Sequence, residues 1–380
     1  MSRPIPRRME RLSQAGIHGH GSEELRLYES RLCRYFAREY GRLEDHPERR
    51  LRDYGISTRE GPMWQETEAL MSQHYDERPE FFQAFLDTRY LAYSMAYYGA
   101  TAAAVMRSDR SLEAAQQAKF ELICQRARLR GDERIFSIGC GFAPLETFLL
   151  ENYPGVQVVS ITPSQVQADY IRTRMQDAAH PLSCGRMRLI QGDFATATAS
   201  DLGRERYDLV FAVGMFEHVN NLHSAFHRIA TLLRANGRCF LHLIVSQPLF
   251  PQYLDARRTL IGRYFPGGRV WPFREIREQT EFFDLVDCWF VNGLNYWRTL
   301  DEWHRRFWAH MDQLYGPVLS LEGVRHWNDY FSLCKTVLFA PLEGRVYGNG
   351  HYLFRKKTNG SDSAIRGPQG QDCIETPEGE

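Results

Sequence analysis

The stretch "RIFSIGCGFAPLETFLLENY", residues 134–153, contains the features that decide the fold. It begins with an apolar run, turns through Gly139 and Gly141, and continues with helical periodicity from Pro144. Glycine adopts backbone conformations that other residues resist, so the chain can turn sharply here and bring a helix N-terminus close to a ligand. A strand, a glycine turn and a helix in this order predict one unit of an α/β fold.

The same alternation continues along the chain. Further apolar runs occur at 156–161, 187–192, 207–213 and 238–245, and helical patterns fall between them at 163–176 and 221–235. Runs that are apolar at successive positions suit strands covered on both faces, and their alternation with helices indicates parallel pairing. We therefore predict an α/β fold with a mostly parallel sheet, to which two later strands, 285–293 and 350–356, also belong.

The segments outside this core differ in composition. Residues 1–65 comprise a basic start, an amphipathic helix over 23–43 and a polar linker, and residues 66–128 are predicted to be helical. The core itself is predicted over 129–357, with a loop rich in proline, glycine and aromatic residues at 246–272. Residues 358–380 carry many acids and few apolar groups, so we expect a disordered tail.

Composition and charge exclude several classes of protein. The 380 residues carry 47 basic and 47 acidic side chains, so no net positive field attracts nucleic acid. Hydrophobic residues make up 43% and charged residues 25%, and no apolar run approaches the roughly 20 residues that cross a bilayer. The eight cysteines include no CxxC pair, so neither a metal site nor a disulfide framework is indicated, and we expect a cytoplasmic protein.

The first eleven residues form a basic cluster of four arginines with a single acid, Glu10. We predict a solvated tail here, and the alternative is peripheral contact with lipid headgroups at the inner membrane surface.

The glycine turn favours a nucleoside ligand over a dinucleotide. The third position of a dinucleotide fingerprint falls on Pro144, and the end of the next strand, "VVSIT", offers no acid for a ribose. A nucleoside without a pyrophosphate remains, with Asp193 in "LIQGDF" able to accept a hydrogen bond from an adenine amine. A tight turn without a ligand is the alternative.

A series of short stretches occurs in an order known from one enzyme family: "HYD" (74–76), "FFQAFLD" (81–87), "YSMAYY" (93–98), "SLEAAQQAK" (111–119), "SIGCG" (137–141), "ITPSQVQ" (161–167), "GMFEHV" (214–219), "FLHLI" (240–244), "FPGG" (265–268) and "LNYWRTLDEWHRRF" (294–307). From about His74 to Lys356 the chain resembles the cyclopropane fatty acid synthases and mycolic acid cyclopropane synthases. These are class I S-adenosylmethionine methyltransferases, and their relatives include the plant coclaurine N-methyltransferases.

The resemblance implies a Rossmann-like class I methyltransferase fold with an N-terminal helical segment, and S-adenosylmethionine as the cofactor. It implies that Tyr93 and Ser94 cover the sulfonium group. The positions that it implies for the rest of the cofactor are Gly139, Cys140 and Gly141 for the amino acid part, Thr162 and Gln167 near the ribose, and Asp193 for the adenine. Without the resemblance, Tyr93 reads as a core aromatic residue and Gln167 as part of a solvated helix face.

Glu217 and His218 follow the end of the strand at 207–213, where open α/β sheets bind ligands. Methyl transfer to an alkene leaves a carbocation, from which a base must remove a proton. In the resembled family that base is a bound bicarbonate, whose implied contacts here are Glu217, His242, the Ile244 backbone and Tyr330. His218 is predicted to support the turn or the cofactor, or to act as a base. The alternatives are a helix-start carboxylate at 217 and a core histidine at 242.

Two departures from the family pattern concern the acceptor pocket. Met95 replaces the cysteine that adjoins the bicarbonate site, and Asn295 replaces a histidine before Tyr296. The leading function is methyl transfer to an electron-rich carbon of an apolar alkene, with a lipid acyl chain as first candidate. The rivals are N- or C-methylation of a small specialised metabolite and a silent relative that acts through partners. A homodimer remains open.

Overall fold

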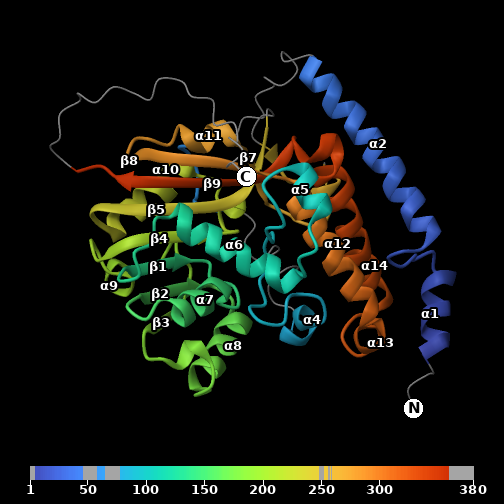
Figure 1. The fold of residues 1–380 in the computed structure, drawn as a ribbon, viewed down its shortest axis with the longest axis horizontal. Coiled ribbons are helices and arrows are strands. Elements are labelled where there is room, and N and C mark those ends of the chain that lie inside the picture. Colours follow the sequence, from blue (N-terminus) through green and yellow to red (C-terminus); the bar gives the residue numbers. More distant parts are fainter. Residues whose placement is uncertain are drawn as a thin grey trace.

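The computed structural model describes residues 5–45, 58–64, 78–247 and 252–358, apart from 256 and 258. Figure 1 shows a sheet with helices on both faces on one side of the molecule and a group of helices on the other, with α2 along the outer edge of that group. The predicted acidic tail, apart from residue 358, and parts of the predicted linker, helical block and 246–272 loop lie outside the described residues.

The described strands form a nine-stranded sheet, and its main body is parallel. Its strands are β1 (Arg134–Ile138), β2 (Gln157–Thr162), β3 (Met187–Gln191), β4 (Tyr207–Val213), β5 (Leu233–Ser246), β6 (Gln252–Tyr253), β7 (Arg269–Pro272), β8 (Phe283–Asn292) and β9 (Tyr347–Lys356). The five strands β3-β2-β1-β4-β5 pair in parallel, and β9 then pairs antiparallel with both β5 and β8. The predicted α/β class with a mostly parallel sheet is confirmed.

Both faces of the sheet are covered, which explains why its strands are apolar at successive positions. One face packs against α6 (Leu112–Arg126) and α7 (Pro144–Asn152), which contribute Phe120 and Phe148. The other face packs against α10 (Leu222–Leu232) and α11 (Phe273–Arg277). The helical pattern predicted over 221–235 ends earlier than expected, because Leu233 already pairs with Tyr207 in the sheet.

A separate core lies among the helices next to the sheet. The remaining helices are α1 (Ile5–Gln14), α2 (Glu23–Asp45), α4 (Pro79–Gln83), α5 (Ala102–Arg107), α8 (Gln165–Gln176), α9 (Ala199–Leu202), α12 (Leu294–Ala309), α13 (Met311–Leu314) and α14 (Leu321–Leu333). A π-helix over Cys334–Phe339 continues α14. No helix in the described part of the chain is long and apolar enough to span a bilayer.

One prediction for the N-terminal part is wrong in detail, and the described residues add to another. Residues 5–14 form α1, in which Glu10 and Arg11 are exposed and Leu12 is buried in the helical core. Within the predicted helical block, the segment from 84 to 101 is not helical. The carboxylate of Asp87 there accepts hydrogen bonds from the amides of Tyr90 and Ala92, at 2.7 and 2.8 Å, and so stabilises a turn.

Helix α2 is held against the π-helix by buried charge. Lys335 is only 1% exposed, and its ammonium lies 2.9 Å from both Glu29 of α2 and Asp301 of α12. Burial alone would raise the pKa of Asp301, but a hydrogen bond with His20 and the charge of Lys335 hold that pKa below its usual value. The N-terminal helices therefore brace an element that, as described below, lines a cavity.

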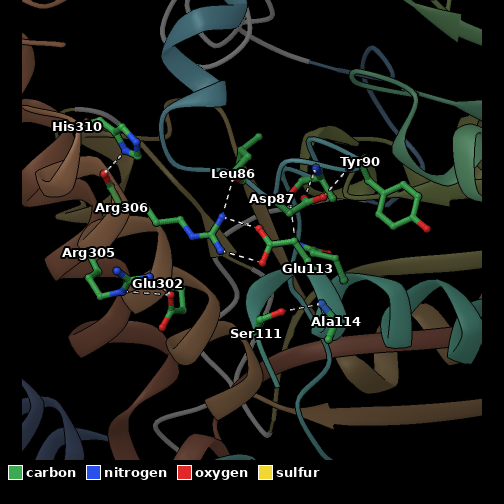
Figure 2. Close-up of polar contacts among 12 residues, drawn as sticks. Leu86, Asp87, Tyr90, Ser111, Glu113, Ala114, Glu302, Arg305, Arg306 and His310 are labelled. Carbon is green, nitrogen blue, oxygen red and sulfur yellow. Dashed lines mark hydrogen bonds and ion pairs between the residues drawn. The ribbon is translucent and has the colours of Figure 1, made fainter. Parts of the chain in front are cut away.

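Arg306 of α12 connects this helical layer to the sheet-covering layer (Figure 2). Its guanidinium makes two hydrogen bonds to the carboxylate of Glu113 in α6, at 2.8 and 3.0 Å, and one to the carbonyl of Leu86. We expect Arg306→Met to lower the free energy of unfolding by about 1–3 kcal/mol, since it leaves Glu113 without its bidentate partner. Thermal unfolding would measure the loss.

The neighbouring Arg305 provides a matched control, because its exposed guanidinium pairs with the half-buried carboxylate of Glu302 within the same helix, whereas Arg306 is mostly buried (Figure 2). Arg305→Met should change stability by no more than about 0.5 kcal/mol, as is usual for surface pairs. Equal effects of the two substitutions would contradict a special role of Arg306.

Candidate active site

Two adjoining cavities open at the carboxyl ends of the central strands. The first, of about 630 Å³ with its mouth, lies against the glycine turn after β1. The second, of about 770 Å³ with its mouth, lies beyond the ends of β4 and β5. Both are lined by Tyr93, Ser94 and Gly214, so the two spaces meet at these residues. A ligand in one can therefore reach a ligand in the other.

The glycine turn forms one wall of the first cavity, as the sequence predicts for residues 139–141. Gly139 and Gly141 have φ angles of 70° and 56°, in the left-handed region that favours glycine. The amides of Gly139 and Cys140 donate to the carbonyl of Ile161, which ties the turn to β2. A Cβ added to Gly141 would meet no atom within 4 Å, so this position leaves open space in which a ligand can approach the backbone.

The other predicted cofactor residues are divided between this cavity and its surroundings. Gln167 lines the cavity, and its Oε1 accepts a hydrogen bond of 2.7 Å from the hydroxyl of Thr162, which leaves its amide N–H groups available as donors. Asp193 does not line the cavity. Its Oδ1 accepts hydrogen bonds from the Trp64 indole and the Ala195 amide, at 2.9 and 2.7 Å. The residues at the turn thus fit a nucleoside whose ribose hydroxyls face an amide side chain.

A buried amine holds Ser94 at the junction of the two cavities. The ammonium of Lys119 donates to the hydroxyl of Ser94 and to Oε1 of Gln116, at 2.8 and 2.6 Å. The amide of Gln116 donates in turn to the carbonyls of Ala92 and Ser94. Burial lowers the pKa of Lys119 to about 7, although the charge of Asp87 opposes this shift. These bonds fix the non-helical segment that separates the cavities.

The second cavity has mostly apolar and aromatic walls and contains the buried carboxyl of Glu217. Oε1 of Glu217 accepts a hydrogen bond of 2.8 Å from the Ile244 amide, and Oε2 has no hydrogen-bond partner among the described residues. Burial raises the pKa of Glu217 to about 7, while the Ile244 amide lowers it. The predicted pocket residues Met95, Ile244, Tyr296 and Tyr330 line the same cavity.

The phenols of this cavity are weaker candidates for a base. Tyr93 and Tyr330 hydrogen-bond to each other, and burial raises the pKa of both well above the usual value. Burial also raises the pKa of the Cys334 thiol to about 12. Glu217 is therefore the group in this cavity that exchanges a proton near neutral pH.

His242 is held as a neutral hydrogen-bond donor. The guanidinium of Arg126 can only donate, so Nδ1 of His351, 3.0 Å away, must accept. Nε2 of His351 then carries the proton and donates to Nδ1 of His242 at 2.7 Å. Burial, together with nearby positive charge, lowers the pKa of both rings, which agrees with two neutral imidazoles.

The proton of His242 therefore lies on Nε2, which is 3.0 Å from the side-chain amide of Asn349. If Nε2 of His242 donates, the Asn349 group that faces the ring must be its amide oxygen, because the amide nitrogen cannot accept. A rotation of the Asn349 amide by half a turn, which exchanges its oxygen and nitrogen, provides this arrangement. The other end of the Asn349 amide is buried and has no hydrogen-bond partner among the described residues. With both nitrogens engaged, His242 supports Asn349, which lines the second cavity.

The groups predicted to bind bicarbonate thus form hydrogen bonds with other protein groups. The Ile244 amide donates to Glu217, and His242 bonds to His351 and Asn349. Neither the geometry nor the comparisons below support a bound bicarbonate. His218 does not line either cavity, and its ring stacks on Phe265 with centroids 5.3 Å apart.

The raised pKa of Glu217 makes stability depend on pH. Between the ordinary value of 4.5 and about 7, the folded state keeps a proton that the unfolded state has lost, so stability falls as pH rises through this window. Glu217→Gln retains the acceptor for Ile244 but cannot ionise. We expect this variant to gain on the order of 3 kcal/mol relative to wild type between pH 4.5 and 8. Thermal midpoints of both proteins across this range would test it, and a constant difference would contradict it.

The family is decided by a match of residues 64–341 to the model of the mycolic acid cyclopropane synthetase family. The chain belongs to this family. This membership agrees with the resemblance carried by the motifs of the sequence.

Known members of the family that resemble this chain act on different substrates. It is 29% identical over 239 residues to cyclopropane-fatty-acyl-phospholipid synthase of Escherichia coli K12, a match that covers 62% of this chain and 56% of that protein. The chain thus matches little more than half the length of that relative. It is 25% identical over 318 residues to a probable (S)-tetrahydroprotoberberine N-methyltransferase of Papaver bracteatum, covering 80% and 84% of the two chains.

The fold resembles a solved structure of coclaurine N-methyltransferase bound to N-methylheliamine and S-adenosylhomocysteine. The TM-score is 0.75 at 20% identity, and the match covers 92% of this chain and 99% of that one. At this identity the likeness shows the fold alone. Members of the mycolic acid cyclopropane synthetase family and its relatives thus include enzymes for both lipids and alkaloids.

Several site residues escaped the sequence analysis. Gln116 and Lys119 lie in the stretch 111–119 that carries the resemblance, but no role was assigned to them. Glu146 directly follows the glycine turn, but no local pattern marks it as a site residue. His351 and Asn349 reach the site only through the pairing of β9 with β5.

Proposed function

We propose that this enzyme transfers a methyl group from S-adenosylmethionine to an electron-rich carbon of an apolar alkene, giving a cyclopropane or a methyl branch, with a lipid acyl chain as the first candidate acceptor. The observation that carries the proposal is the second cavity, whose walls are mostly apolar and whose proton-exchanging group near neutral pH is Glu217. Such a cavity favours an acceptor with little polar surface.

The first cavity would hold the methyl donor. The glycine turn leaves space at Gly141 for the donor to approach the backbone, and the amide N–H groups of Gln167 can donate hydrogen bonds to ribose oxygens. When bound, the donor supplies a methyl group on a sulfonium, which is electrophilic without further activation. Tyr93 and Ser94, at the junction, would cover this group, and Lys119 fixes the position of Ser94.

The residues of the second cavity would manage the charge that develops on the acceptor. Aromatic faces stabilise a nearby cation by about 0.5–2 kcal/mol each, and the stacked rings of Tyr296 and Phe339, 4.4 Å apart, lie in this wall. Oε2 of Glu217 is the unbonded oxygen and would take up the proton released from the acceptor. The direct bond from Ile244 keeps the other oxygen fixed, so Glu217 would act here without bicarbonate.

The second candidate is N-methylation of a small metabolite. It is favoured by the similarity in sequence to alkaloid N-methyltransferases, and by the same unbonded oxygen of Glu217, which could accept a proton from an amine. In this case the carboxyl would act on the nucleophile rather than on a carbocation.

Transfer of a labelled methyl group separates the two. The enzyme would be incubated with methyl-labelled S-adenosylmethionine and either vesicles of unsaturated phospholipid or an extract of soluble metabolites. We expect label in the lipid fraction. Label confined to the soluble fraction would overturn the lipid proposal and support N-methylation. Tight donor binding with label in neither fraction would support a silent relative.

A further inference from the structure

A second buried carboxyl, that of Glu146, lies in the first cavity. Glu146 occupies the first turn of α7 and is 1% exposed. Its Oε1 accepts a hydrogen bond of 3.1 Å from the hydroxyl of Ser160, and the hydroxyl of Ser137 also bonds to the carboxyl. Its Oε2 is buried and has no hydrogen-bond partner among the described residues. The carboxyl is therefore only partly satisfied by the protein.

A role in stabilising α7 does not account for this arrangement. Acidic residues in a first helical turn usually remain in solvent, where they interact with free backbone amides. Here the side chain is buried and lines the cavity beside Gly139 and Gly141, although its own backbone amide also bonds to the carboxyl. A buried polar atom without a hydrogen-bond partner is destabilising. A ligand that supplies a hydrogen-bond donor or a positive charge would offset this destabilisation.

The residues that line the first cavity indicate that it would bind a positively charged group. Among the described residues that line it, Glu146 is the one with a carboxyl group, and no lysine, arginine or histidine shares that lining. The methyl donor of this family carries an α-ammonium group on its amino acid part. A cation placed in a mostly buried space needs an opposite charge to offset its lost hydration.

We propose that Glu146 is the counter-charge that binds the α-ammonium group of S-adenosylmethionine. This inference rests on the methyltransferase assignment and is independent of the identity of the methyl acceptor. Ser137 and Ser160 act as positioning residues, since their hydroxyls hold the carboxyl and leave Oε2 without a protein partner among the described residues.

Binding should involve one proton. The elements packed around Glu146 face it with the hydroxyls of Ser137 and Ser160 and with the thiol of Cys140, whose own pKa is raised first by burial and then by the charge of Glu146. Burial likewise raises the pKa of Glu146 above its usual value, so less of this carboxyl is ionised at a given pH than for an exposed glutamate. The ammonium group favours the carboxylate, so a proton held by the carboxyl passes to solvent as the carboxylate–ammonium pair forms.

Calorimetric titration with two ligands tests the proposal. S-adenosylhomocysteine has the α-ammonium group, whereas 5′-methylthioadenosine has the same nucleoside and lacks the amino acid part. We expect Glu146→Gln to weaken binding of S-adenosylhomocysteine by about 10- to 100-fold, the scale of a lost charged hydrogen bond. Binding of 5′-methylthioadenosine should stay within about two-fold of wild type. In wild type, affinity for S-adenosylhomocysteine should rise from mildly acidic to neutral pH, and the variant should lose this dependence.

A second variant guards against an effect on folding. Ser137 lines the same cavity and contacts Glu146, so Ser137→Asp in the Glu146→Gln background should restore much of the affinity for S-adenosylhomocysteine. Equal weakening of both ligands, or no weakening of either, would overturn the proposal. Failure of the wild-type protein to bind either ligand would instead contradict the methyltransferase site itself.

Discussion

Replacing Glu217 by glutamine should reduce turnover by roughly 100-fold or more, the scale of a lost acid–base or electrostatic group. The substitution preserves the shape of the side chain and the acceptor for the Ile244 amide, so the cavity should remain intact. It removes the ability of Oε2 to take up a proton. Affinity for S-adenosylhomocysteine should remain within a few-fold, because Glu217 does not line the first cavity.

The pH profile provides the corresponding signature. The pKa of Glu217 is raised to about 7 by burial, so kcat/KM of wild type should increase as pH rises through about 7 and the carboxylate forms. The residual activity of Glu217→Gln should not show this increase in kcat/KM with pH. Glu275→Gln is a suitable control. Burial also raises the pKa of Glu275, but this residue lines neither cavity, so its substitution should not change turnover. Unchanged turnover in Glu217→Gln would remove this residue from the mechanism.

The second large effect is expected at the glycine turn. Gly141→Val should weaken binding of S-adenosylhomocysteine by about 10- to 100-fold, since a side chain there enters the open space of the first cavity, and overpacking costs about 1–3 kcal/mol. Its positive φ angle adds a backbone strain that lowers stability.

Gly185 separates these two effects. It also has a positive φ angle, 76°, and open space around its Cβ position, but it lies on an exposed turn before β3. Gly185→Val should therefore lower the thermal midpoint by a similar amount without affecting ligand binding. If both variants bound S-adenosylhomocysteine like wild type, the first cavity would not be the donor site.

The parts of the fold that the sequence predicts are those set by local pattern. The five parallel strands are apolar at successive positions because helices cover both faces of the sheet, and this pattern is visible in single runs such as 207–213. The non-helical segment from 84 to 101 could not be predicted in this way. Its turns depend on Asp87 and on side chains of α6 such as Gln116, which are contacts between elements.

The candidate site shows the same division. The resemblance indicated Glu217, His242 and Tyr330, which the structure brings around one cavity from distant positions in the chain. It could not indicate that His351 and Asn349 occupy both nitrogens of His242, because this depends on the antiparallel register of β5 and β9. The expected bicarbonate site is not supported, because these contacts and the hydrogen bond from the Ile244 amide to Glu217 already occupy the groups that would bind the anion.

The central claim is that the methyl donor lies in the first cavity with its reactive group at the junction with the second. A crystal structure of the protein with S-adenosylhomocysteine tests this most directly. We expect its sulfur at the junction formed by Tyr93, Ser94 and Gly214, facing the cavity that contains Glu217. Sulfur directed away from that junction, or the ligand bound outside the first cavity, would contradict the account.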